Sequence, residues 1–292
     1  FQPVPPRLKR ITNTQYRNVI NDVFGLTMPL DLGLSPDNQL HGFRTIAASM
    51  FSLSLADVEA YEGAAYWIAQ SFFRDESRLS RFVNCDLSEP SCMEAFIIRV
   101  GAILWRRPLA TEEVVTLNRL WSDLNNQPFS HVERAEFVLS SLLQSPDFLF
   151  FIEEGEPNPD NPDNRRKTSR ELLIAMSVLL WDSPPTETLL NLYADRMYDS
   201  GVEGEVYAHL INDPRSARGL VGFFEEYLQL DRLDTLEKSR AHFVLMSDTL
   251  ASAMRTEAKG MIENIIRSPR TDIRSLLTTK ETFINEELAQ LY

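Results

Sequence analysis

A basic and aromatic run, Trp105, Arg106 and Arg107 followed by Pro108, carries the most unusual local chemistry of the sequence. Two guanidinium groups can hold a carboxylate through paired hydrogen bonds, and the neighbouring indole can stack on a ligand or a cation. The run is therefore a candidate contact for an anion or a partner protein. The alternative is structural, with the arginines joining neighbouring helix ends through carbonyls and acids. We favour this alternative, because cations suit the carboxyl end of a helix.

Cys85 and Cys92 are the two cysteines of the chain, and they enclose a short polar loop that contains a proline. This spacing predicts a local disulfide, which the chain-entropy model values at about 2–3 kcal/mol. The alternative is a pair of reduced and unrelated thiols.

Other patterns offer little chemistry. The four histidines stand alone, without a second ligand at helical or strand spacing, and no CxxCH haem-attachment motif occurs. Glu225 and Glu226 could form a paired-carboxylate site, but a solvated helix face is the simpler interpretation. We therefore predict no catalytic site, no metal site and no cofactor in this chain.

Composition excludes some functions. The formal net charge is −13 and the isoelectric point is about 4.9, which argues against a nucleic-acid partner, because such proteins need a basic face. No apolar run approaches the roughly 18–20 residues of a transmembrane segment. The chain starts without Met and without a signal-peptide core, so we expect a mature product or an excised piece.

The elements that must position these residues are helices. Apolar residues recur at helical spacing along most of the chain, and no period-two alternation indicates a strand. The central helix should begin with a capping box of Ser91 and Glu94 and end before Pro108. Thr111 is the expected N-cap of the next helix. The predicted fold class is all-α and multi-helical.

The chain divides into two helical halves. Residues 1–153 form the first half, with an opening module at about 7–75 and a short disulfide-bearing module at about 85–152. Residues 154–169 are rich in Pro, Asn and Asp and have no apolar anchor, which predicts a mobile linker. Residues 170–292 form a second module that we expect to be incomplete, and its last helix should need cover from a partner surface.

Several stretches together resemble a known family. RLKRITNTQYRNVINDVFGL, CMEAFIIRVGAILWRRPLATEEV, FFEEYLQLDRLD and TFINEELAQLY are similar, in this order, to modules of secreted multidomain proteins from planctomycetes and myxobacteria. These proteins are associated with cytochrome c modules, and the function of their other domains is unknown. The middle module is marked by a cysteine, an arginine-bearing helix and an R-R-P-L exit. The resemblance spans nearly the whole chain.

The resemblance implies export to the periplasm or beyond. It also implies a protein partner, either a cytochrome-type module, a later module of the family or a second copy, with any haem on the partner or on an absent module. Our main hypothesis is an exported helical scaffold or subunit of a larger assembly, with a redox link as one option. The alternative is part of an exported oxidoreductase or hydrolase whose active site other modules or another chain complete. A polar pocket containing Arg106 or Arg107 would favour the enzyme, and a broad apolar face without a pocket would favour the scaffold.

Overall fold

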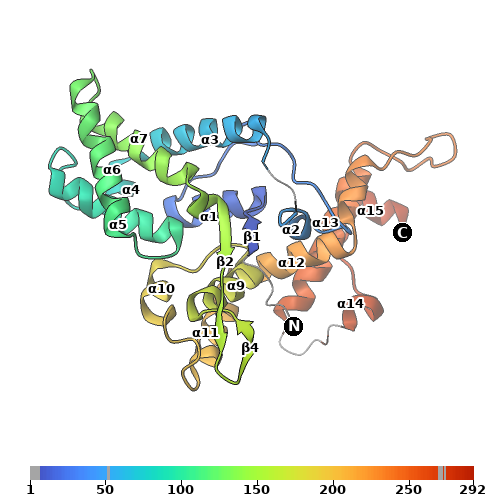
Figure 1. The fold of residues 1–292 in the computed structure, drawn as a ribbon. Coiled ribbons are helices and arrows are strands. Elements are labelled where there is room, and N and C mark those ends of the chain that lie inside the picture. The colour runs from blue at the N-terminus through green and yellow to red at the C-terminus, as the bar shows by residue number, and fades with distance from the viewer. Residues whose placement is uncertain (1–6, 51–52, 269–271, 273) are drawn as a thin grey trace.

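The structure is a computed structural model that describes residues 7–50, 53–268, 272 and 274–292. It is mostly helical, with two small antiparallel sheets among the described residues, so the predicted fold class is confirmed (Figure 1). The first half begins with one strand and these helices: β1 Arg7–Arg10, α1 Asn13–Phe24, α2 Arg44–Ala47, α3 Leu55–Phe73, α4 Glu76–Leu79, α5 Pro90–Trp105, α6 Thr111–Asp123, the 3-10 helix Leu124–Asn126, α7 His131–Gln144 and α8 Pro146–Leu149.

The first half ends with the strand β2 Phe150–Glu153. The elements after it are β3 Glu156–Asn158, β4 Asn161–Arg166, α9 Ser169–Trp181, α10 Glu187–Tyr193, α11 Val202–Asn212, α12 Ser216–Tyr227, the 3-10 helix Leu230–Thr235, α13 Leu250–Arg267, α14 Ser275–Thr278 and α15 Glu286–Leu291. No helix in the described ranges has both the length and the apolar character needed to cross a membrane.

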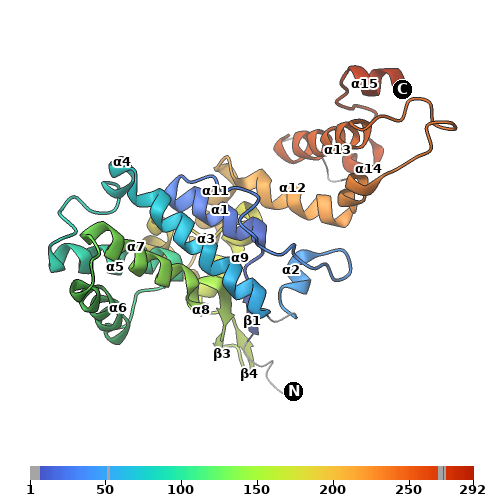
Figure 2. The same ribbon diagram turned by 90° about the horizontal axis from the view of Figure 1, so that it is seen from above.

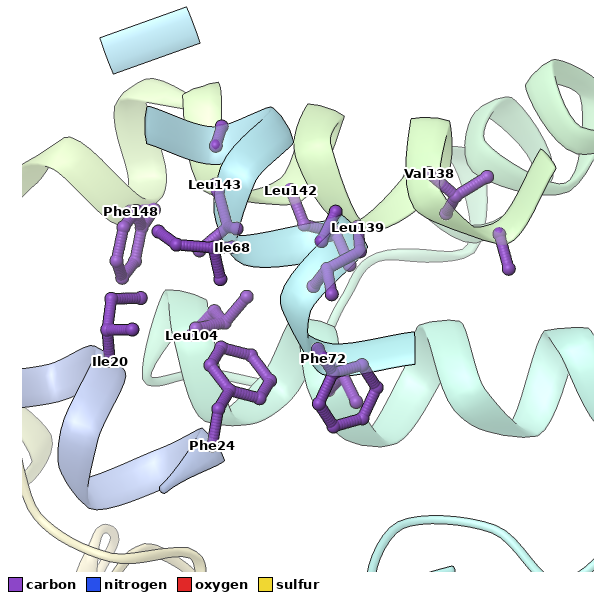
Figure 3. Close-up of a cluster of buried hydrophobic side chains, with 14 of the residues drawn as sticks. Ile20, Phe24, Ile68, Phe72, Leu104, Val138, Leu139, Leu142, Leu143 and Phe148 are labelled. Carbon is purple, nitrogen blue, oxygen red and sulfur yellow. The ribbon is translucent and has the colours of Figure 1, made fainter. Parts of the chain in front are cut away.

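One large core unites α1, α3, α5, α7 and α8. Apolar side chains from these helices converge between them (Figure 3). The labelled members are Ile20, Phe24, Ile68, Phe72, Leu104, Val138, Leu139, Leu142, Leu143 and Phe148. The opening module and the disulfide module therefore share a single core.

β1 joins the start of the chain to the end of the first half. It pairs antiparallel with β2, and Lys9 lies opposite Phe151 in the register. The backbone amide of Ile11 continues this contact by donating to the Leu149 carbonyl at 2.8 Å. This pairing places the N-terminal strand beside the residues that follow α8.

The second half has cores of its own. Leu173, Trp181, Leu189, Val206 and Leu210 belong to a cluster formed by α9, α10 and α11. A much smaller cluster joins α13 to α15, and in Figure 2 these helices stand away from the main body beyond α12.

The last helix, α15, folds back onto its own domain. Its N-cap is Asn285, whose side chain accepts from the Leu288 amide at 2.9 Å. Leu288 is buried against Leu250 and Ala253 of α13. Contacts within the chain therefore cover this helix, whereas we expected a partner surface to cover it.

Two predicted helix starts are wrong. α5 begins at Pro90 after Glu89, so Ser91 lies inside the first turn and forms no cap. Proline suits this first helical position because its fixed φ matches the helix and its missing amide has no acceptor there. α6 follows Ala110 rather than Thr111, and the Glu113 carboxylate accepts from the Ala110 amide at 2.7 Å.

The disulfide prediction is confirmed, because Cys85 and Cys92 are bonded with their Cα atoms 5.8 Å apart. Residues 154–169, in contrast, are not an open linker. They contain the β3–β4 hairpin, in which Glu156 pairs with Arg166, and the two side chains form an ion pair at 2.7 Å. Glu171 fixes the base of the hairpin by accepting from the amides of Glu154 and Gly155.

Candidate functional site

Arg106 ends α5 in a left-handed backbone conformation, with φ of 59°. Its side chain is 3% exposed, and its guanidinium donates to the carbonyls of Phe148 at 3.2 Å, Phe150 at 2.8 Å and Asp147. The guanidinium carbon also lies 4.8 Å from the centre of the Phe151 ring. Burial lowers the pKa of Arg106 to about 10. Arg106 therefore fastens the end of α5 to the α8–β2 connection.

Arg107 and Trp105 also bind the chain itself. Arg107 forms ion pairs with Asp147 at 2.7 Å and with Glu113 at 2.8 Å. These hydrogen-bonded acids raise the pKa of the Arg107 guanidinium. Trp105 donates its indole N–H to the Leu142 carbonyl at 3.1 Å. The structural interpretation of this run, with arginines holding helix ends, matches these contacts.

The same three residues line one side of a cavity of about 880 Å³. Its walls come from the strand β1 and the start of α1, from the α5 exit and β2, and from one face of α9 and α12. These elements lie together near the middle of the molecule (Figure 1). The cavity is thus built by segments from the start, the middle and the end of the chain.

Two glycines of α12 shape one wall of the cavity. A side chain at Gly219 would clash with the Leu179 carbonyl, so this glycine allows α9 and α12 to pack closely. Gly222 is different, because a Cβ atom there would meet no atom within 4 Å. A glycine inside a helix costs about 1 kcal/mol relative to alanine, and at Gly222 no neighbouring atom requires it. Its effect is to leave the cavity open beside α12.

Large apolar side chains stay exposed in the cavity walls. Ile152 is 41% exposed, Leu179 is 62% exposed and Phe223 is 45% exposed. Phe43 stacks on Phe223, with ring centres 5.7 Å apart. Ligand pockets characteristically combine such apolar walls with a few polar groups.

Among the acids that line the cavity, Asp182 has a strongly raised pKa. It ends α9 in a left-handed conformation, with φ of 50°. Asn18 Nδ2 donates to the Asp182 carbonyl at 3.0 Å and to its Oδ2 at 3.1 Å. Burial raises the pKa of Asp182 to about 6, although the Gln15 side chain and the charge of Arg218 oppose this shift. A carboxyl group with such a pKa can exchange protons near neutral pH.

Lys9 brings a cation to the same cavity. Burial lowers the pKa of its ammonium group, and the charges of Glu153 and Asp182 act in the opposite direction. Glu226 also lines the cavity, where it pairs with Arg44 at 3.2 Å, and burial raises its pKa. We interpreted Glu226 as part of a solvated helix face, but the structure turns it toward the cavity.

The sequence pointed to the Trp105–Arg107 run but not to Lys9 or Asp182. For Asp182 a signal existed, because an acid at the carboxyl end of a helix opposes the helix dipole. No feature of the sequence distinguishes Lys9 from the basic residues beside it. No histidine lines this cavity, and no group of three potential metal ligands occurs among the described residues. The disulfide lies at the opposite end of α5 from Trp105.

Comparison with known families divides the chain into three consecutive matches. Residues 9–74 match a protein of unknown function (DUF1587), residues 92–153 match a protein of unknown function (DUF1595), and residues 168–292 match a protein of unknown function (DUF1592). No curated protein and no solved structure matches the chain significantly. None of the matched ranges is a cytochrome domain.

The cavity takes residues from all three matched ranges: Lys9 and Gln15 from the first, Trp105 and Ile152 from the second, and Asp182 from the third. The chain therefore consists of consecutive DUF1587, DUF1595 and DUF1592 domains, which are the modules of planctomycete cytochrome-associated proteins.

Proposed function

We propose that this chain is the ligand-binding unit of an exported assembly, and that it holds a small amphiphilic molecule between its three domains. The observation that carries the proposal is the cavity of about 880 Å³ with Ile152, Leu179 and Phe223 exposed in its walls. Small-molecule sites commonly measure about 300–1,000 Å³ and often lie where domains meet. Ligand binding is favoured when the ligand covers apolar side chains that are exposed in such a space.

The cavity also bears on the two hypotheses from the sequence. A scaffold needs no enclosed space, whereas the rival hypothesis anticipates a polar pocket that includes Arg106 or Arg107. Both arginines line this cavity, together with Lys9, Asp182 and Glu226. A binding unit therefore accounts for more of the structure than a scaffold alone.

We propose in addition that the protein is exported and that it binds a partner protein. The Cys85–Cys92 disulfide supports export, because such bonds persist in oxidising compartments. A cytochrome-type module, a later module of the family or a second copy is the proposed partner. Phe283 and Ile284 support this, since each is about half exposed on the C-terminal domain.

Binding of the neutral fluorophore N-phenylnaphthylamine tests the proposal. We expect saturable binding of one molecule per chain to the wild type. The variant Gly222→Leu fills open space in the cavity, so it should bind at least tenfold more weakly while its melting temperature is maintained or raised.

Gly63→Leu is the matched control, because Gly63 also lies inside a helix, with no atom within 4 Å of its Cβ position, but outside the cavity. The control should bind the fluorophore like the wild type. Equal binding by all three proteins, or no saturable binding by the wild type, would contradict the proposed function.

A second candidate function is acid–base catalysis by Asp182, favoured by its pKa of about 6 inside the cavity. A general acid or base works best when its pKa lies near the working pH. Chromogenic esters, phosphates and glycosides should be tested with the wild type and Asp182→Asn. Turnover that depends on one ionisation near pH 6 and disappears in the variant would establish catalysis, and absence of turnover on every substrate would count against it.

A further inference from the structure

Lys9 lacks a partner for its ammonium group. It forms no hydrogen bond and no ion pair with any residue that the structure describes. Strand geometry sends successive side chains to opposite faces, and the next residue, Arg10, binds Asp37 at 2.6 Å and Tyr61 at 2.8 Å. Lys9 therefore points the other way, into the cavity that it lines.

The acids whose charges act on Lys9 are already engaged. Glu153 pairs with Lys167 at 2.6 Å, and Asp182 accepts a hydrogen bond from Asn18. An ammonium group that is partly removed from water, as that of the half-buried Lys9 is, loses free energy of hydration that no acceptor in the chain replaces. The lowered pKa of Lys9 has the same cause. An acceptor supplied from outside the chain would remove this cost.

The other cations of the cavity have partners within the chain. Arg44 pairs with Glu226, Arg107 pairs with Asp147, and Arg106 binds backbone carbonyls. Arg170 pairs with Asp195 at 3.1 Å. Among the described residues that line the cavity, Lys9 is thus the cation available to a ligand.

We propose that the ligand is an organic carboxylate with an apolar body, and that its carboxylate forms an ion pair with Lys9. This inference rests on the proposed function and adds the charge of the ligand. The apolar body would cover Leu179 and Phe223, in the space that Gly222 leaves open. A carboxylate oxygen accepting from an ammonium forms a charge-assisted hydrogen bond, which is stronger than a neutral one.

Displacement of N-phenylnaphthylamine at pH 7.5 tests this inference with three molecules that share one alkyl chain: dodecanoate, dodecanol and dodecylamine. We expect dodecanoate to displace the fluorophore at about tenfold lower concentration than dodecanol, the effect of one charge-assisted hydrogen bond. Dodecylamine should be the weakest competitor, because its cation meets the Lys9 ammonium.

Variants assign the preference to Lys9. Lys9→Met should remove the advantage of dodecanoate over dodecanol and leave dodecanol binding unchanged, whereas Lys9→Arg should keep the advantage. Lys280→Met removes an exposed lysine of the C-terminal domain and should behave like the wild type.

The experiments distinguish a failure of the proposed function from a failure of the carboxylate assignment. If the wild type does not bind the fluorophore saturably, the proposed function fails and this inference fails with it. If the fluorophore binds but dodecanol equals dodecanoate, or Lys9→Met keeps the full preference, the cavity is a ligand site and the carboxylate assignment is wrong.

Discussion

Replacing Asp182 by Asn should stabilise the protein, and the size of the effect should depend on pH. The pKa of Asp182 is raised from 3.8 to about 6 in the folded state. Each unit of such a difference corresponds to about 1.4 kcal/mol, so the ionised carboxylate costs up to about 3 kcal/mol of folding free energy. Asn has nearly the same shape, keeps an acceptor for Asn18 and tolerates the left-handed backbone of this position.

The direction of the pH dependence follows from proton binding. Between pH 3.8 and 6 the folded state holds the Asp182 proton more tightly than the unfolded state does, so this group lowers stability progressively as pH rises. Above pH 6 the cost is fully present. The gain in Asp182→Asn should therefore be up to about 3 kcal/mol at pH 7.5 and only about 1 kcal/mol at pH 4.5.

Urea unfolding of both proteins at the two pH values measures the gain. Asp22→Asn is not a suitable control, because Asp22 pairs with Arg218 and Arg215. Asp123→Asn is suitable, because Asp123 and its partner Arg119 are 69% and 80% exposed, and an ion pair so exposed contributes little stability. If Asp182→Asn is less stable than the wild type at pH 7.5, or if its gain is the same at both pH values, burial is not what perturbs this carboxyl group.

Three other substitutions test the framework around the cavity. Arg106→Met should cost about 3 kcal/mol or more in urea unfolding, because it leaves buried carbonyls without a donor; a cost below about 1 kcal/mol would contradict this. Replacing Cys85 and Cys92 by serine should cost about 2–3 kcal/mol, measured against the oxidised protein, and an unchanged stability would show that the loop needs no covalent closure. Gly219→Ala should lower the melting temperature because its methyl group meets a backbone carbonyl, whereas Gly63→Ala should raise it; a rise in both would show that the α9–α12 packing is loose.

Local signals in the sequence predicted much of the helical framework. For example, Ser54 with Asp57 and Ser130 with Glu133 have the spacing of a capping box and form one in the structure, and Gly25, a residue type that favours a helix end, ends α1 with φ of 66°. These features depend on residues three or four positions apart, so a single stretch contains all the information. The start of α5 was misplaced because two local signals competed, and Pro90 prevailed over Ser91.

The hairpin and the cavity depend on contacts that no single stretch contains. The β3–β4 hairpin has no alternating apolar face, and Glu171, outside the hairpin, fixes its base. Lys9 and Asp182 become neighbours only because β1 pairs with β2 and because Asn18 of α1 holds the end of α9. Their perturbed pKa values arise from burial by distant segments. Sequence patterns report which face of a helix is apolar, but not which groups from other helices will meet it.

The packing also shows how far the three domains depend on one another. The first two domains share one core, so neither can bury its apolar surface without the other. The third domain has its own core, but Ile174 and Val178 of α9 also pack against the core of the first two domains. Charged contacts, such as Arg218 with Asp22 at 2.7 Å and Arg44 with Glu226 at 3.2 Å, join it to the first domain as well. Such contacts fix orientation but contribute little stability when they are partly exposed. The third domain therefore has a core of its own, and its apolar and charged contacts with the other two domains complete the cavity.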